Sequence, residues 1–183
     1  YLHPKYFKPD NSVLKNMGLK RNEKYVLLRF VSWDATHDIG QGGLSLQKKR
    51  ELIRELSQSA TVYISSEERL DEEFQPFEIN IHPWEIHHVL ANASLLISEG
   101  ATMASEGAIL GTPTIYINSL KAGTIEEQCF KYGLISSFRD EDGILKKAIE
   151  LTKNDSIKNE WIKKREKLIS EKSDVTELIL SSI

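Results

Sequence analysis

Short apolar runs alternate with amphipathic stretches along most of this chain, and this alternation constrains the fold more than any other feature. The runs are rich in β-branched and aromatic residues, as buried strands are; they cover residues 25–31, 61–65, 94–98 and 113–117, with 77–81 as a short further candidate. Helical patterns occupy about 12–18, a stretch from Ser45, 84–92, 102–110, 125–131, 141–152 and a long stretch from Ile157. We therefore expect an α/β fold, with a doubly wound parallel sheet and helices on both faces.

Charge and composition exclude several classes of protein. The 183 residues include 24 Lys or Arg and 27 Asp or Glu, which gives a formal net charge of −3. A slightly acidic chain lacks the basic footprint that binds nucleic acid or an anionic membrane, so we expect no nucleic-acid partner. With 40% hydrophobic and 28% charged residues, the composition is that of an ordinary globular domain.

Cysteine usage and the start of the chain bear on compartment and completeness. Cys129 is the single cysteine, which excludes an intramolecular disulfide and a multi-cysteine metal site, and the cytoplasm is the default expectation. No apolar run approaches the roughly 20 residues that span a membrane. The chain begins Tyr1-Leu2-His3-Pro4 without an initiator methionine or a signal-peptide pattern. We expect a piece of a longer protein.

The strongest motif lies in residues 100–113, where a strand leads directly into a helix. Gly100 lets a ligand approach the backbone, and the amides of Ala101, Thr102 and Met103 lie at the helix N-terminus, where the helix dipole favours a diphosphate. Glu106 follows about one turn later, where it can accept hydrogen bonds from a pair of ribose hydroxyls. The alternative is that small residues are simply common at strand–helix junctions and that Gly111 and Pro113 stop the helix.

This block resembles the donor-nucleotide motif of GT-B-type glycosyltransferases. It is similar to the lipid II-forming N-acetylglucosaminyltransferase and to UDP-N-acetylglucosamine 2-epimerase. The wider pattern resembles an uncharacterised prokaryotic GT-B-like family, over almost the whole chain. Its marks are Leu2-His3-Pro4, Arg29-Phe30-Val31-Ser32-Trp33, His37-Asp38-Ile39-Gly40, Ile86-His87, Ala101-Thr102-Met103 and Asp174-Val175-Thr176.

The resemblance implies a Rossmann-like domain that forms the C-terminal half of a GT-B fold. Residues 1–20 would be the linker from a missing N-terminal domain, and residues 21–183 the nucleotide-sugar-binding domain. By similarity, Glu106 would hold the ribose, the amides after Gly100 the phosphates, and the stretch containing His82 and Trp84 the base. Two departures from the pattern are Glu99, which puts a carboxylate beside the expected diphosphate, and Gly107, where such families more often have Ala.

A second candidate segment is the glycine-bearing loop after the first strand. His37 and Asp38 lie there, and in the related enzymes this loop approaches the diphosphate or the transferred sugar. We expect them to act as catalytic residues, with His37 donating to the leaving phosphate. Gly40, Gly42 and Gly43 offer further amides as a phosphate loop. The alternative is a surface loop that happens to contain a histidine.

Other residues carry weaker signals. His82, His87 and His88 do not have the spacing of a shared zinc site, so we expect no metal and no cofactor beyond the nucleotide-sugar substrate. Cys129 reads as a small buried hydrophobe. We expect Trp161 and the apolar stretch 175–183 to pack on the missing domain; without it they would leave an apolar patch and favour weak self-association.

Three functions remain open from the sequence. The first is a metal-independent glycosyltransferase using a UDP-type donor, with this chain as its donor-binding half and the missing half supplying the acceptor site and any peripheral membrane contact. The second is a UDP-sugar 2-epimerase-like enzyme, and the third a nucleotide-binding module without catalysis. In every case we expect the isolated chain to show no turnover.

Overall fold

The computed structural model describes residues 1–20, 23–32, 43–119 and 122–181. Within these ranges the strands are β1 (Tyr25–Phe30), β2 (Thr61–Ser66), β3 (Leu95–Ser98), β4 (Thr114–Ile117) and β5 (Ile135–Phe138). The helices are α1 (Ser12–Asn16), α2 (Leu46–Leu56), α3 (Ile86–Asn92), α4 (Ala101–Leu110), α5 (Gly123–Phe130), α6 (Ile144–Lys153), α7 (Ile157–Glu171) and α8 (Val175–Leu180), with short 3-10 turns η2 (Gln75–Phe77) and η3 (Pro83–Glu85). This is the expected α/β fold.

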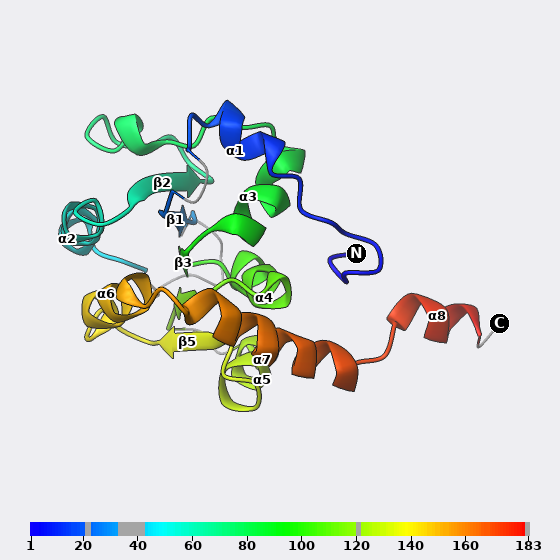
Figure 1. The fold of residues 1–183 in the computed structure, drawn as a ribbon. Coiled ribbons are helices and arrows are strands. Elements are labelled where there is room, and N and C mark those ends of the chain that lie inside the picture. The colour runs from blue at the N-terminus through cyan, green and yellow to red at the C-terminus, as the bar shows by residue number, and fades with distance from the viewer. Residues whose placement is uncertain (21–22, 33–42, 120–121, 182–183) are drawn as a thin grey trace.

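The strands form one five-stranded sheet in the order β2-β1-β3-β4-β5, and every pair is parallel. Alternate residues of β1 point to opposite faces. Val26 and Leu28 belong to the apolar cluster that includes α2 and α6, whereas Tyr25 and Leu27 belong to the cluster that includes α1 and α3. Figure 1 shows these helices on the two sides of the sheet. The sheet is covered on both faces, as a doubly wound fold requires.

The strand order fixes where a ligand is expected to bind. From β1 the chain crosses to β2 on one side, and then returns to β3 on the other side of β1. The carboxyl ends of β1 and β3 therefore mark the topological switch point of the sheet, where open α/β sheets bind their ligands. Phe30 ends β1 and Ser98 ends β3, directly before the block at residues 100–113.

The structure differs from the sequence predictions in two elements and in the packing of one tryptophan. Residues 77–81 form no strand: η2 ends at Phe77, and Glu78 makes only an isolated bridge to Ile64. The edge strand β5 was missed, because two serines interrupt its short apolar run. Trp161 packs in the core of this domain and not on another one, since it is 5% exposed and its indole Nε1 donates to the carbonyl of Leu134 at 2.7 Å.

Both ends of the chain lie on the side of α4 (Figure 1). In the N-terminal segment, Leu2, Val13 and Leu19 are buried in the cluster around α3. At the other end, α8 exposes Val175 and the side chains of residues 178–180. No helix in the described ranges is both long and apolar enough to cross a membrane.

Candidate nucleotide-binding site

The turn from β3 into α4 is held by side-chain and backbone hydrogen bonds of its own residues. The Ser98 hydroxyl accepts from the Gly100 amide at 3.1 Å and donates to the Gly100 carbonyl at 2.8 Å. Gly100 is the N-cap of α4, and no side chain caps the helix there. The amides of the first turn, those of Ala101, Thr102 and Met103, therefore lie at the switch point, and no side chain of the described residues accepts from them. Such a turn attracts an anion.

The glycines of this block stand where a Cβ atom would meet close neighbours. A Cβ atom on Gly100 would lie 3.1 Å from Cγ1 of Val31, at the end of β1. A Cβ atom on Gly107 would lie 2.9 Å from side-chain atoms of both Leu96 and Thr114. Gly107 thus lets α4 sit directly on β3 and β4, which explains the departure from Ala. Gly111 ends the helix at φ 77°, as the sequence predicts.

Glu99 turns away from the expected diphosphate. Its side chain is fully buried, with Oε2 accepting from the Val31 amide at 3.0 Å and Oε1 from the Leu44 amide at 2.7 Å. The ammonium of Lys49 lies 3.8 Å from Oε1. The carboxylate is therefore compensated inside the protein, and it ties the end of β1 to the start of α2. The Glu99 carboxylate therefore has a structural role and does not oppose the binding of a phosphate.

Glu106 faces α3 and the N-terminal segment. Its side chain is 14% exposed, and Nε2 of His87 lies 3.3 Å from Oε1. The Tyr1 hydroxyl donates a hydrogen bond to the same oxygen. This bond, together with burial and the nearby negative charge, raises the pKa of Tyr1 to about 12, so the phenol stays a donor. Sequence reasoning did not pair His87 with Glu106, although both belong to the predicted nucleotide-binding half.

His82 and Trp84 lie in the loop that leads into α3. Their rings stack with centroids 4.4 Å apart and an interplanar angle of 7°. His82 is the N-cap of η3, where its amide donates to the Glu85 carboxylate at 2.8 Å. Trp84 is 72% exposed. The pair is an open aromatic platform, although the structure does not bring it into contact with Glu106.

Most of the expected catalytic loop lies outside the described residues. This holds for His37, Asp38, Gly40 and Gly42. Gly43 is described and partly exposed, immediately before the Leu44 amide that Glu99 holds. The structure thus describes the two anchor points of this loop, at Val31 and Leu44.

No metal centre is found among the residues that the structure describes, where no group of three His, Cys, Asp or Glu is placed to hold an ion. His88 has a structural role: its Nδ1 accepts from the Asp10 amide at 2.9 Å, and its ring packs 4.9 Å from that of Phe7. Cys129 is partly buried on α5 and packs against the core. The chemistry of the described site is therefore that of amides, one carboxylate and one histidine.

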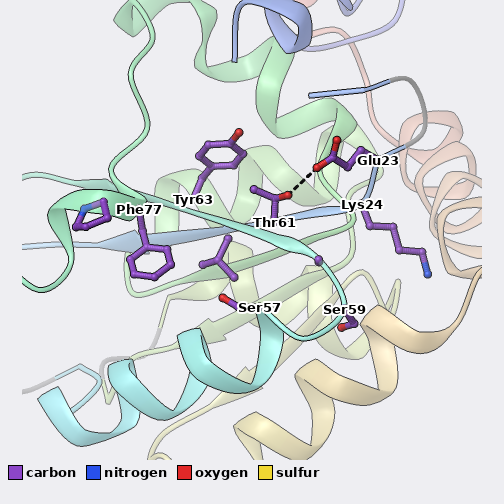
Figure 2. Close-up of a pocket in the computed structure, with 10 residues that line it drawn as sticks. Glu23, Lys24, Ser57, Ser59, Thr61, Tyr63 and Phe77 are labelled. Carbon is purple, nitrogen blue, oxygen red and sulfur yellow. Dashed lines mark hydrogen bonds between the residues drawn. The ribbon is translucent and has the colours of Figure 1, made fainter. Parts of the chain in front are cut away.

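The described residues line two surface cavities, one away from the candidate site and one beside it. One, of about 630 Å³, surrounds the start of β2, and its Thr61 hydroxyl donates to Glu23 (Figure 2). It opens at the amino ends of the strands, opposite to the switch point. The other, of about 1000 Å³, lies between the N-terminal segment, α4, α7 and α8, and includes Glu106 and Ile109 in its wall.

Solved structures share this fold. The spinosyn rhamnosyltransferase SpnG, in complex with spinosyn aglycone, matches with a TM-score of 0.61 at 12% identity, over 89% of this chain and 46% of that one. The spinosyn forosaminyltransferase SpnP matches with a TM-score of 0.60 at 15% identity, over 91% and 45%. A putative UDP-N-acetylglucosamine 2-epimerase from Listeria monocytogenes matches with a TM-score of 0.56 at 14% identity, over 87% and 43%.

These likenesses show the fold, which is that of the C-terminal half of GT-B proteins. The chain spans less than half the length of the solved proteins it matches. No curated protein sequence matches it. The model of one protein family, described as "Protein of unknown function (DUF354)", matches residues 2–183.

Proposed function

The chain belongs to the DUF354 family, and we propose that it is the donor-binding half of a GT-B-type glycosyltransferase that uses a UDP-linked sugar. The observation that carries the proposal is the position of α4. The helix begins at the switch point of the sheet and has no side-chain cap from the part of the chain that the structure describes. It presents Glu106 one and a half turns from its N-terminus.

The first turn of α4 provides the diphosphate site in this proposal. The amides of Ala101, Thr102 and Met103 donate to phosphate oxygens. The helix dipole adds a partial positive charge of about half an elementary charge at this end of the helix. Glu99 does not oppose this, because its carboxylate is buried against Val31 and Leu44. A chain of net charge −3 thus needs no basic patch for a diphosphate.

Other residues bind the remaining parts of the donor. The Glu106 carboxylate accepts hydrogen bonds from the ribose hydroxyls, and the segment with His82 and Trp84 meets the base. His37 and Asp38, in the loop anchored by Glu99, act on the leaving diphosphate and the sugar. Transfer would be metal-independent: the amides of α4 and His37 stabilise the departing UDP, while the other half of the protein positions the acceptor.

Titration calorimetry with UDP, UDP-N-acetylglucosamine, GDP and ADP tests the proposal. We expect UDP-containing ligands to bind and Glu106→Gln to weaken them about tenfold or more, because a hydrogen bond to a charged group contributes about 1.5–3 kcal/mol. Glu141→Gln is a matched control, since Glu141 also faces the start of a helix, where it accepts from the Ser45 hydroxyl at 3.0 Å, but belongs to no predicted contact. Absence of binding by every nucleotide would refute the proposal.

The second candidate is an epimerase, favoured by the shared fold of the putative UDP-N-acetylglucosamine 2-epimerase. Both functions bind the donor in the same way, so they separate only in the products of the full-length protein. A transferase moves the sugar to an acceptor and releases free UDP in the same reaction. An epimerase changes the sugar without an acceptor. Incubating the full-length protein with UDP-N-acetylglucosamine alone, followed by sugar analysis, distinguishes them.

A further inference from the structure

His87 is the feature of this surface that the proposed function does not yet use. It lies in the first turn of α3, and α3 packs beside α4 (Figure 1). Its Nε2 reaches to 3.3 Å from Oε1 of Glu106, and its side chain is 25% exposed. At this separation the imidazole and the carboxylate are in direct polar contact.

Aromatic neighbours fix the orientation of the imidazole. The Tyr1 ring meets it edge to face, with centroids 5.6 Å apart, and the Phe7 ring does so at 6.2 Å with an interplanar angle of 81°. A ring held on two sides has a defined orientation, and its Nε2 is kept beside the Glu106 carboxylate. The partner carboxylate, by contrast, stands at the end of a flexible side chain.

The contacts are concentrated on one oxygen of the carboxylate. Both His87 and Tyr1 approach Oε1 of Glu106. Among the described residues, no hydrogen bond reaches Oε2. A carboxylate fixed through Oε1 presents Oε2 in a defined direction, and fixing a flexible glutamate in advance removes entropy that a ligand would otherwise have to offset.

We propose that His87 is a positioning residue for the nucleotide, holding Oε1 of Glu106 so that Oε2 accepts from a ribose hydroxyl. This inference rests on the proposed function. His87 remains in place when the donor binds. Tyr1 is 78% exposed, and its hydrogen bond to Oε1 leaves Oε2 to the ribose hydroxyl.

The neighbouring histidine provides a matched control. His88 has the same chemistry and the next position in the helix, but it accepts from the Asp10 amide and packs on Phe7. Its removal perturbs the packing of the N-terminal segment without touching Glu106. A purely structural role for His87 would make the two substitutions equivalent.

The experiment measures UDP and 2′,3′-dideoxy-UDP binding by titration calorimetry, with thermal unfolding as the check on folding. We expect His87→Ala to weaken UDP roughly three- to tenfold, the range of one hydrogen bond, and His87→Gln, which keeps an N–H donor, to recover part of the loss. The loss should vanish with the dideoxy nucleotide, which has no hydroxyl for Glu106 to accept from. It should also vanish in the Glu106→Gln background, while His88→Ala binds UDP as the wild type does.

The outcomes separate this inference from the proposed function. If wild-type protein binds UDP and Glu106→Gln weakens it, but His87→Ala does not, the inference is wrong and the proposed function stands. An equal loss from His87→Ala with UDP and the dideoxy nucleotide would also overturn it, because His87 would then act without Glu106. If no nucleotide binds the wild type, both fall.

Discussion

Glu99 offers the most demanding test of the structural account, because its buried carboxylate ties the end of β1 to the start of α2. Two backbone amides, those of Val31 and Leu44, donate to it, and Lys49 compensates its charge. Glu99→Leu leaves both amides without an acceptor. At about 1–3 kcal/mol for each unsatisfied buried group, the expected loss of unfolding free energy is about 2–6 kcal/mol. That is a large part of the 5–15 kcal/mol typical of a domain.

Glu99→Gln refines the test. The amide side chain keeps the shape and one carbonyl oxygen, but turns an N–H₂ group toward one of the two donors, so we expect a loss of about 1–3 kcal/mol. Glu67→Gln is the control: Glu67 also accepts from a backbone amide of the same loop, that of Ser32 at 3.2 Å, but its side chain is 45% exposed. We expect at most about 1 kcal/mol there.

Urea unfolding followed by tryptophan fluorescence and far-ultraviolet circular dichroism measures these differences. The slope of free energy against urea should not change, so that the midpoints report stability alone. The structural role of Glu99 is refuted if Glu99→Gln unfolds within about 0.5 kcal/mol of the wild type, or if the exposed Glu67→Gln costs as much as the buried substitution.

Two further predictions concern packing and pH. Gly107→Ala should destabilise the fold by about 1–2 kcal/mol, because overpacking of about 1–3 kcal/mol exceeds the helix-propensity gain of up to about 1 kcal/mol. Gly123→Ala is the control and should not destabilise the fold, because a Cβ atom there meets nothing within 4 Å. Thermal unfolding of the two variants measures the difference. Burial and the nearby Arg165 lower the pKa of Lys158 to about 7 from 10.5. Between these pH values the unfolded chain holds a proton that the folded chain lacks. The free energy of unfolding therefore rises with pH, by at most about 1.4 kcal/mol per pH unit. Lys158→Met should abolish that rise, and equal pH slopes in the two proteins would contradict the burial of this amine.

The sequence predicted those parts of the fold that depend on local pattern. Ser45 caps α2, with its side chain accepting from the Lys48 amide, and Gly111 ends α4, because capping and chain reversal demand particular residues. The parallel sheet followed from strands that alternate with helices. The hydrophobic pattern did not predict β5, because its four residues, Ile135–Phe138, include two serines and form an edge of the sheet.

Around the candidate site, only the local geometry could be predicted from the sequence. Glu106 and the amides of α4 lie within one strand–helix unit, so their relation follows from helix geometry. Glu99 could not be placed from sequence, because its acceptor role depends on Leu44, which is distant in the chain. The same is true of the pairing of His87 with Glu106, which arises only when α3 packs on α4.

The most direct test of the central claim is to find where UDP binds. Amide chemical shifts of the ¹⁵N-labelled chain, recorded during a UDP titration, report this residue by residue. The account predicts the largest changes at Ala101, Thr102 and Met103, with smaller ones around Glu106, and weaker changes throughout in Glu106→Gln. Changes confined to the opposite end of the sheet, at the Thr61 pocket of Figure 2, or none at the start of α4, would contradict it.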